Sequence, residues 1–272
     1  MDETSDRLST AEEEARQQEG EGIRQSIRAK FQAELGACRD LDAVVFDVVE
    51  RRGSEPSAPV GTAAGPAVMF LFGKIWRSFN AARILAQEGY GPDAMVVARS
   101  LVNGAIDLGY IVKADSEERA RQWCAVGEKA QQDYREQFGE APDTDQYLNR
   151  DRIEARAKHW KEMRINKRAE HSGLEGLYQI AYRAGSSPEH SDSWSSIDYV
   201  EGISGGGLSV QVGPSEKGII RALSAACWGL SEAFLRWCKF FGFDEDEAAE
   251  RVKEIAHQFS ESEENRKVRG GG

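Results

Sequence analysis

The residues from Tyr182 to Asp192 read YRAGSSPEHSD and combine an arginine, a histidine and several hydroxyl groups. Arginine stabilises negative charge on phosphate oxygens, and histidine gives and takes protons near neutral pH. Arg183 and His190 could therefore serve phosphoryl chemistry, while the hydroxyl groups of Tyr182 and Ser186 orient the phosphate. This segment is our candidate catalytic site.

A structural interpretation of the same residues stays open. Gly185 is typical of the position that follows a helix C-terminus, and Pro188 prevents the helix from continuing. In that case His190 is a packed or solvent-facing side chain with no chemical role.

A second group of polar residues interrupts an apolar segment. Arg99, Asn103 and Asp107 follow one another at intervals of four, so in a helix they share one face. Buried polar groups need partners or cost free energy. The group is either a hydrogen-bond network that fixes helix packing or the polar lining of a small-molecule pocket.

The third candidate is a basic segment in an acidic chain. Residues 150–168 hold eight Lys or Arg and three acids, a local charge of 8 − 3 = +5, whereas the whole chain carries −11. Cations interleaved with an aromatic residue suit a phosphate backbone and an unstacked base. The alternative is a solvated, salt-bridged helix face. The candidate binding residues here are Arg152, Arg156, Trp160 and Arg164.

Composition limits the class of protein. The 272 residues are 40% hydrophobic and 30% charged, which is typical of a globular chain. The acidic balance argues against non-specific coating of nucleic acid. The four cysteines form no CxxC pair, which predicts free thiols in a reducing compartment. Neither a signal peptide nor a membrane span is predicted, and we expect a cytoplasmic protein without metal or cofactor.

Seven prolines divide the chain into long stretches with helical periodicity. The sequence predicts an all-α fold, a bundle of about seven to eight helices. We expect a flexible acidic arm over 1–21, an amphipathic helix over 22–53, a linker over 54–65, a helical domain over 66–259 and a flexible tail over 260–272.

Two features inside the helical domain stand out. Residues 185–214 are rich in Gly and Ser and predict a long irregular insertion with a short hairpin. Between Ile220 and Phe241 the apolar residues recur at intervals of three and four. Such a stripe needs a helical partner, so it predicts a homo-oligomer or a partner helix.

Three short motifs together resemble an uncharacterised bacterial all-helical family, a domain of unknown function. They are the segment Gly89–Asp107, Trp160, and the pattern Tyr182-Arg183-x-x-Ser186-x-x-x-His190. The resemblance covers roughly residues 65–195. The family carries an acid four residues after the arginine, where this chain has Asn103, which puts a role for that acid in doubt unless Asp107 replaces it.

More loosely, Arg183 and His190 are similar to the R-x(4–6)-H motif of HEPN ribonucleases. That resemblance implies RNA cleavage without a metal, in which the RNA's own 2′-hydroxyl is the nucleophile. Arg183 would stabilise the transition state and His190 would act as general acid or base. HEPN proteins occur in bacterial toxin–antitoxin and phage-defence systems. Unlike a continuous HEPN helix, this segment contains Gly185 and Pro188.

The sequence therefore leaves three functions open. The first is an RNA-cleaving or RNA-binding protein with a HEPN-like site. The second is a non-catalytic interaction module that associates through the 220–241 stripe or the 22–52 helix. The third is a small-molecule-binding bundle with a pocket at Arg99, Asn103 and Asp107.

Overall fold

The computed structural model describes residues 3–52, 62–137, 149–183, 185, 199–203, 207–243 and 245–270. Within this part the chain is helical apart from two short strands and loops, which confirms the all-α prediction. The helices are α1 (Glu3–Lys30), α2 (Gln32–Arg52), α3 (Ala64–Gln87), α4 (Gly91–Lys113), α5 (Ser116–Gln137), α7 (Arg150–Glu162), α8 (Ile165–Ser172), α9 (Glu175–Leu177), the π-helix η1 (Tyr178–Tyr182), α12 (Ile219–Phe241) and α13 (Glu245–Gly270).

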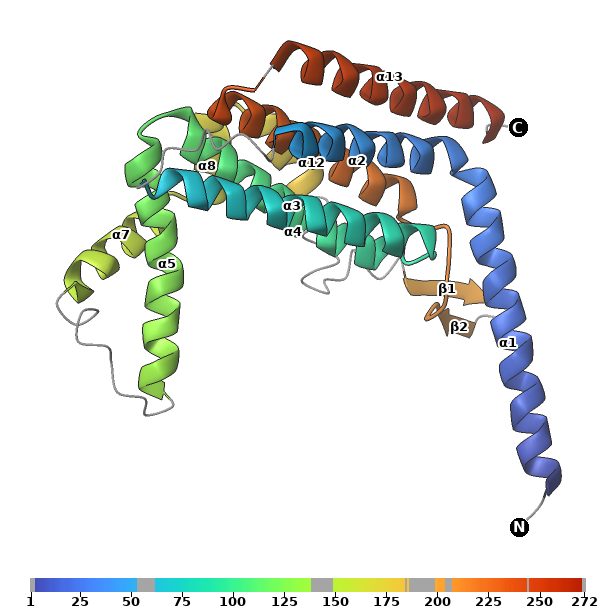
Figure 1. Ribbon diagram of the computed structural model, residues 1–272. Coiled ribbons are helices and arrows are strands. Elements are labelled where there is room, and N and C mark those ends of the chain that lie inside the picture. Colours follow the sequence, from blue (N-terminus) through green and yellow to red (C-terminus); the bar gives the residue numbers. More distant parts are fainter. Residues whose placement is uncertain are drawn as a thin grey trace.

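The core is built around α4, which packs against both α3 and α12, and these two helices also pack against each other (Figure 1). Most of α4 is buried because its residues are apolar on nearly every face. The α3–α4 connection is tight, as the glycines and proline there predict. At its end Gly91 touches the start of α12, where an added Cβ would lie 2.0 Å from the Lys217 carbonyl oxygen. Only glycine allows the two backbones to approach this closely.

The apolar stripe of α12 finds its helical partners inside the chain. Leu230 and Phe234 are fully buried against the α3–α4 layer, and Phe234 stacks on Phe72 of α3 with ring centroids 6.2 Å apart. The helix ends at Gly242, as its sequence predicts. Most of the stripe therefore packs inside the chain, while Ile220 and Cys227 stay partly exposed. The homo-oligomer or partner helix that the stripe predicted stays a prediction.

The remaining helices extend the molecule into an arch (Figure 1). Helices α2 and α13 lie along one side of the core and contact each other. Helices α5 and α7 pair to form an arm at one end, and α1 extends from the other end. The N-terminus of α3 is held by α5, because the Glu117 carboxylate accepts hydrogen bonds from the Ala63 and Ala64 amides at 2.8 and 3.1 Å.

The helices extend beyond several of the expected boundaries. Helix α1 begins at Glu3 and α13 continues to Gly270, so most of the residues expected to form an arm and a tail are helical. The predicted 22–52 helix is interrupted at Phe31, and the basic segment 150–168 is interrupted at Met163 and Arg164. These interruptions explain why the described part of the chain holds more helices than predicted. The linker lies largely outside the described residues.

The predicted hairpin is present within the 185–214 insertion. Strands β1 (Val200–Ile203) and β2 (Gly207–Val210) pair antiparallel, with Val200 opposite Val210. The apolar side chains of Leu208, Val210 and Val212 are exposed.

One described helix, α4, is long and apolar enough to cross a membrane, and 67% of its most apolar stretch is buried inside the protein. A largely buried apolar helix is what the core of a soluble protein requires, so α4 is compatible with a soluble protein.

Candidate functional site

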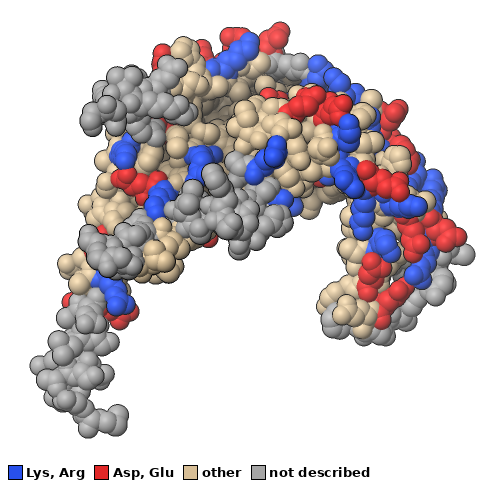
Figure 2. Space-filling model, turned by 180° about the vertical axis from the view of Figure 1, so that it is seen from behind, with Lys and Arg blue, Asp and Glu red and all other residues tan. Residues whose placement is uncertain are grey.

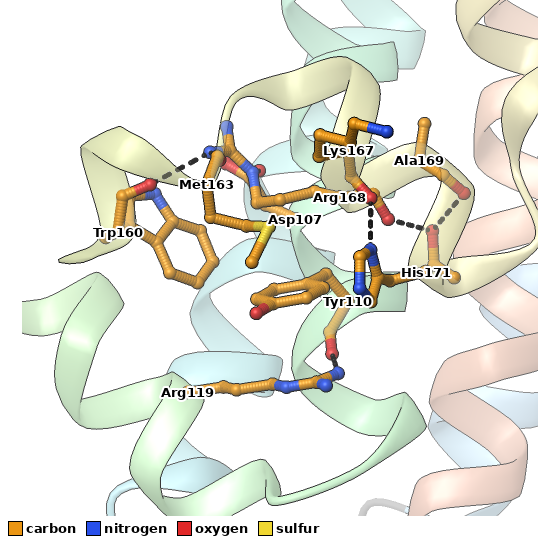
Figure 3. A network of polar contacts seen from close by, with 10 residues as sticks. Asp107, Tyr110, Arg119, Trp160, Met163, Lys167, Arg168, Ala169 and His171 are labelled. Carbon is orange, nitrogen blue, oxygen red and sulfur yellow. Dashed lines mark hydrogen bonds and ion pairs between the residues drawn. The ribbon is translucent and has the colours of Figure 1, made fainter.

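The buried carboxylate of α4 is paired with an arginine from α8 (Figure 3). The Nε of Arg168 donates to Asp107 Oδ1 at 2.7 Å, and both side chains are about nine-tenths buried. Arg168 Nη1 also donates to the carbonyl oxygens of Trp160, at 3.3 Å, and Met163. These carbonyl groups lie at the C-terminus of α7, so one side chain, that of Arg168, connects the α7–α8 junction to the core.

Aromatic rings surround this ion pair. The guanidinium of Arg168 lies over the Trp160 ring at 4.8 Å, and Trp160 meets Tyr110 edge-on with centroids 5.6 Å apart. Arg119 of α5 covers Tyr110 at 4.0 Å and donates to its carbonyl oxygen (Figure 3). Trp160 is 5% exposed. In this structure its indole packs against the guanidinium of Arg168 and has no exposed face on which a nucleobase could stack.

Burial is the largest influence on the pKa of Asp107. It raises the pKa of this carboxyl to about 6 from the usual 3.8, against the opposing effect of Arg168. A folded-state pKa above the unfolded one means that between about pH 4 and pH 6 the folded protein holds a proton that the unfolded chain releases. Ionisation of Asp107 therefore lowers the free energy of unfolding as the pH rises through this window.

We expect the Asp107→Asn variant to lack this loss. Urea titrations of both proteins at intervals from pH 4 to pH 7 give the difference in free energy of unfolding. The difference should move in favour of the variant by about 3 kcal/mol across the window. Other carboxyls titrate equally in both proteins and cancel, so a difference that stays constant with pH would contradict the assignment.

Helix α4 makes a second polar contact eight residues before Asp107, and its partner there is η1. Arg99 Nη2 donates to the Tyr182 hydroxyl at 2.9 Å, and the guanidinium lies over the Tyr182 ring at 4.4 Å. Tyr182 also stacks on Tyr178, with centroids 5.3 Å apart. Two sequence-predicted groups that are 83 positions apart therefore meet at one place. The turn that carries the tyrosines is a π-helix, a conformation frequent at functional sites.

The backbone that follows Tyr182 is held against the same arginine. Gly185 is buried, and an added Cβ there would lie 2.6 Å from the Arg99 Cβ. Arg183, which lies between Tyr182 and Gly185 in the sequence, is exposed and donates from Nη1 to the Gln179 amide oxygen at 3.1 Å. The other two candidate residues of the 182–192 segment, Ser186 and His190, lie outside the described residues.

Part of the basic segment is neutralised by acids, some of them on the neighbouring helix α5. Arg156 makes two hydrogen bonds to the Glu118 carboxylate, at 3.1 and 2.9 Å, and these lower the pKa of Glu118. Arg150 is paired with Glu136 and Glu154. Figure 2 shows cations and acids intermixed over this arm. The structure thus matches the salt-bridged interpretation for part of the segment.

Two predicted binding residues of this segment stay exposed. Arg152 lies on α7, and Arg164 lies at the α7–α8 junction. A cavity of about 530 Å³ lies between α5 and α7 and is lined in part by Arg152 and Arg156.

The three polar residues predicted to share one face of α4 do not share one partner. Arg99 faces η1, Asp107 faces α8, and the half-buried Asn103 lies between them. Arg168 was not among the predicted site residues. Its signal in the sequence was indirect, because a buried aspartate in an apolar helix needs a cation as its partner. Among the residues that the structure describes, no three His, Cys, Asp or Glu lie together as metal ligands.

A family model described as a family of unknown function, DUF5677, matches residues 66–207, slightly more than half of the chain. The chain belongs to DUF5677. This confirms the prediction of an uncharacterised helical family over nearly the same residues. The DUF5677 region contains α4, η1 and the Asp107–Arg168 pair, so both polar contacts of α4 lie inside the family domain. No curated protein and no solved structure matches the chain.

Proposed function

We propose that this DUF5677 protein binds RNA and cleaves it without a metal, at the junction of α4 and η1. The observation that carries the proposal is the contact between Arg99 and Tyr182. It joins the arginine of α4 to the Tyr-Arg-x-x-Ser-x-x-x-His motif, so two groups of candidate residues that lie far apart in the sequence form one cluster.

The charge of Arg183 favours an anionic ligand. Within the described part of the chain, Arg183 donates to a neutral amide, that of Gln179, and forms no ion pair with a carboxylate. Two arginines of α7 differ, because Arg150 and Arg156 are already paired with acids. An exposed guanidinium without a carboxylate partner is the better candidate for a phosphate.

His190 follows the fixed backbone at Gly185 by five residues, which span at most about 18 Å when extended. In the proposed reaction the RNA 2′-hydroxyl attacks the adjacent phosphorus and the bond to the 5′-oxygen breaks. His190 transfers the protons, and Arg183 stabilises the charge on the phosphate oxygens. The similarity to HEPN ribonucleases supports a role as a bacterial defence or toxin component. The cysteine usage and the absence of a predicted signal peptide or membrane span support a cytoplasmic location.

The test is cleavage of a mixed pool of structured and single-stranded RNA in EDTA. We expect His190→Ala and Arg183→Ala to lower the rate at least about 100-fold. The matched controls are His257→Ala and Arg39→Ala, which change exposed residues of the same types on α13 and α2 and should leave the rate unchanged. Equal activity in all four variants, or intact RNA at every protein concentration, would refute the proposal.

A second function, a non-catalytic interaction module, is favoured by one observation. Large apolar side chains are exposed outside the buried α12 stripe, including Phe46 of α2 and Phe70 of α3. Such a module leaves RNA intact and is insensitive to His190→Ala, but it forms an oligomer or a complex that light scattering detects. The same protein samples therefore separate the two functions.

A further inference from the structure

Two cysteines that are 189 positions apart in the sequence lie together between α2 and α12. The Sγ atoms of Cys38 and Cys227 are 3.1 Å apart. A disulfide bond measures about 2.05 Å, so a movement of roughly 1 Å separates this contact from a covalent bond. The two helices pack against each other, which holds the thiols in place (Figure 1).

We propose that Cys38 and Cys227 are an oxidative modification site, at which a reversible disulfide ties α2 to α12. The proposal is independent of the RNA function. All four cysteines are free in this structure, in agreement with the sequence analysis. The tertiary structure adds the pairing, which no sequence spacing revealed.

The different exposure of the two residues sets the order of events. Cys227 is partly exposed as a residue, although its thiol group is buried, and Cys38 is fully buried. An oxidised glutathione that enters between α2 and α12 therefore reaches Cys227 first. The Cys227 thiolate attacks one glutathione sulfur, the glutathione disulfide breaks, and one glutathione leaves as the thiol. Cys38 then attacks the Cys227 sulfur and releases the second glutathione. Two protein thiols are oxidised, and one glutathione disulfide is reduced to two thiols.

The bond is expected to form slowly and to stabilise the fold. The neighbouring Cys38 thiol and burial raise the pKa of Cys227, so little reactive thiolate is present. Once formed, the bond closes a loop that contains the α3–α4 layer and restricts the unfolded chain. A bond across a loop of this length should raise the Tm by about 5–10 °C.

The experiment incubates the full chain overnight with excess oxidised glutathione, blocks remaining thiols with N-ethylmaleimide under denaturing conditions, and measures mass. We expect two maleimide additions in place of four, and one proteolytic peptide pair that joins Cys38 to Cys227. Cys38→Ser and Cys227→Ser should each abolish the linked peptide and the Tm increase. The matched control Cys124→Ser, which changes a half-buried cysteine on α5, should retain both.

Three results would overturn the proposal. These are four maleimide additions after oxidation, a linked peptide that involves Cys124 or Cys238, and a Tm increase that persists in Cys38→Ser. If a serine variant fails to fold, the mass and the linked peptide of the wild-type chain still decide the matter.

Discussion

Replacement of Leu230 by aspartate is expected to unfold the protein. Leu230 is fully buried where α12 meets the α3–α4 layer. A carboxylate placed there loses its hydration and gains no cation, and the site also loses the packing of the leucine side chain. We expect a loss of at least about 5 kcal/mol in the free energy of unfolding, which approaches the whole stability of many domains.

The measurement is urea unfolding followed by circular dichroism, together with light scattering. Leu230→Ala should lose about 2–5 kcal/mol, because it creates a cavity without adding a charge. The matched control is Val212→Asp, which introduces the same carboxylate at an apolar residue that is 86% exposed and should change stability by less than about 0.5 kcal/mol. A folded Leu230→Asp protein of smaller mass than the wild type would instead show that the stripe forms an oligomer.

Replacement of Arg168 by methionine is expected to have the second largest effect. It leaves the Asp107 carboxyl buried without its partner, and the carbonyls of Trp160 and Met163 lose a donor. Removal of one member of a buried ion pair costs about 3–5 kcal/mol. Because Arg168 also fastens the α7–α8 junction, we expect hydrogen exchange to increase in α7 and α8 before it increases in α12.

A double-mutant cycle separates the ion pair from general disruption of the core. The double variant Asp107→Leu, Arg168→Met removes both charges and keeps the volume apolar, so it should be more stable than Arg168→Met alone by about 2 kcal/mol. Arg164→Met serves as a control, since Arg164 is an exposed arginine at the same junction. If the two losses simply add in the double variant, Asp107 and Arg168 are not coupled.

The helices were largely predictable because their signals are local. The stripe of α12, its end at Gly242 and the tight α3–α4 connection follow from spacing and from residues with special backbone preferences. The interruption at Met163 and Arg164 was not predictable in this way. It depends on Arg168, which binds carbonyls of α7 while it reaches Asp107 on another helix.

The candidate site was predictable as residue types but not as an arrangement. The sequence indicated that Arg99 and Asp107 need partners, and it indicated that Tyr182 and Arg183 belong to a motif. It did not indicate that Arg99 contacts Tyr182 or that Arg168 contacts Asp107. It likewise favoured Trp160 as an aromatic for stacking, whereas burial makes it the support of an ion pair.

The sequence by itself determined the all-α class, the apolar faces of the helices and the polar residues on α4 that require partners. Periodicity and backbone preference act over a few residues, so one chain reports them directly. Only the tertiary structure decided which partners those residues have, that the α12 stripe is covered within the chain, and that Cys38 lies beside Cys227. Each of these contacts joins residues more than sixty positions apart, and their proximity depends on how whole helices pack.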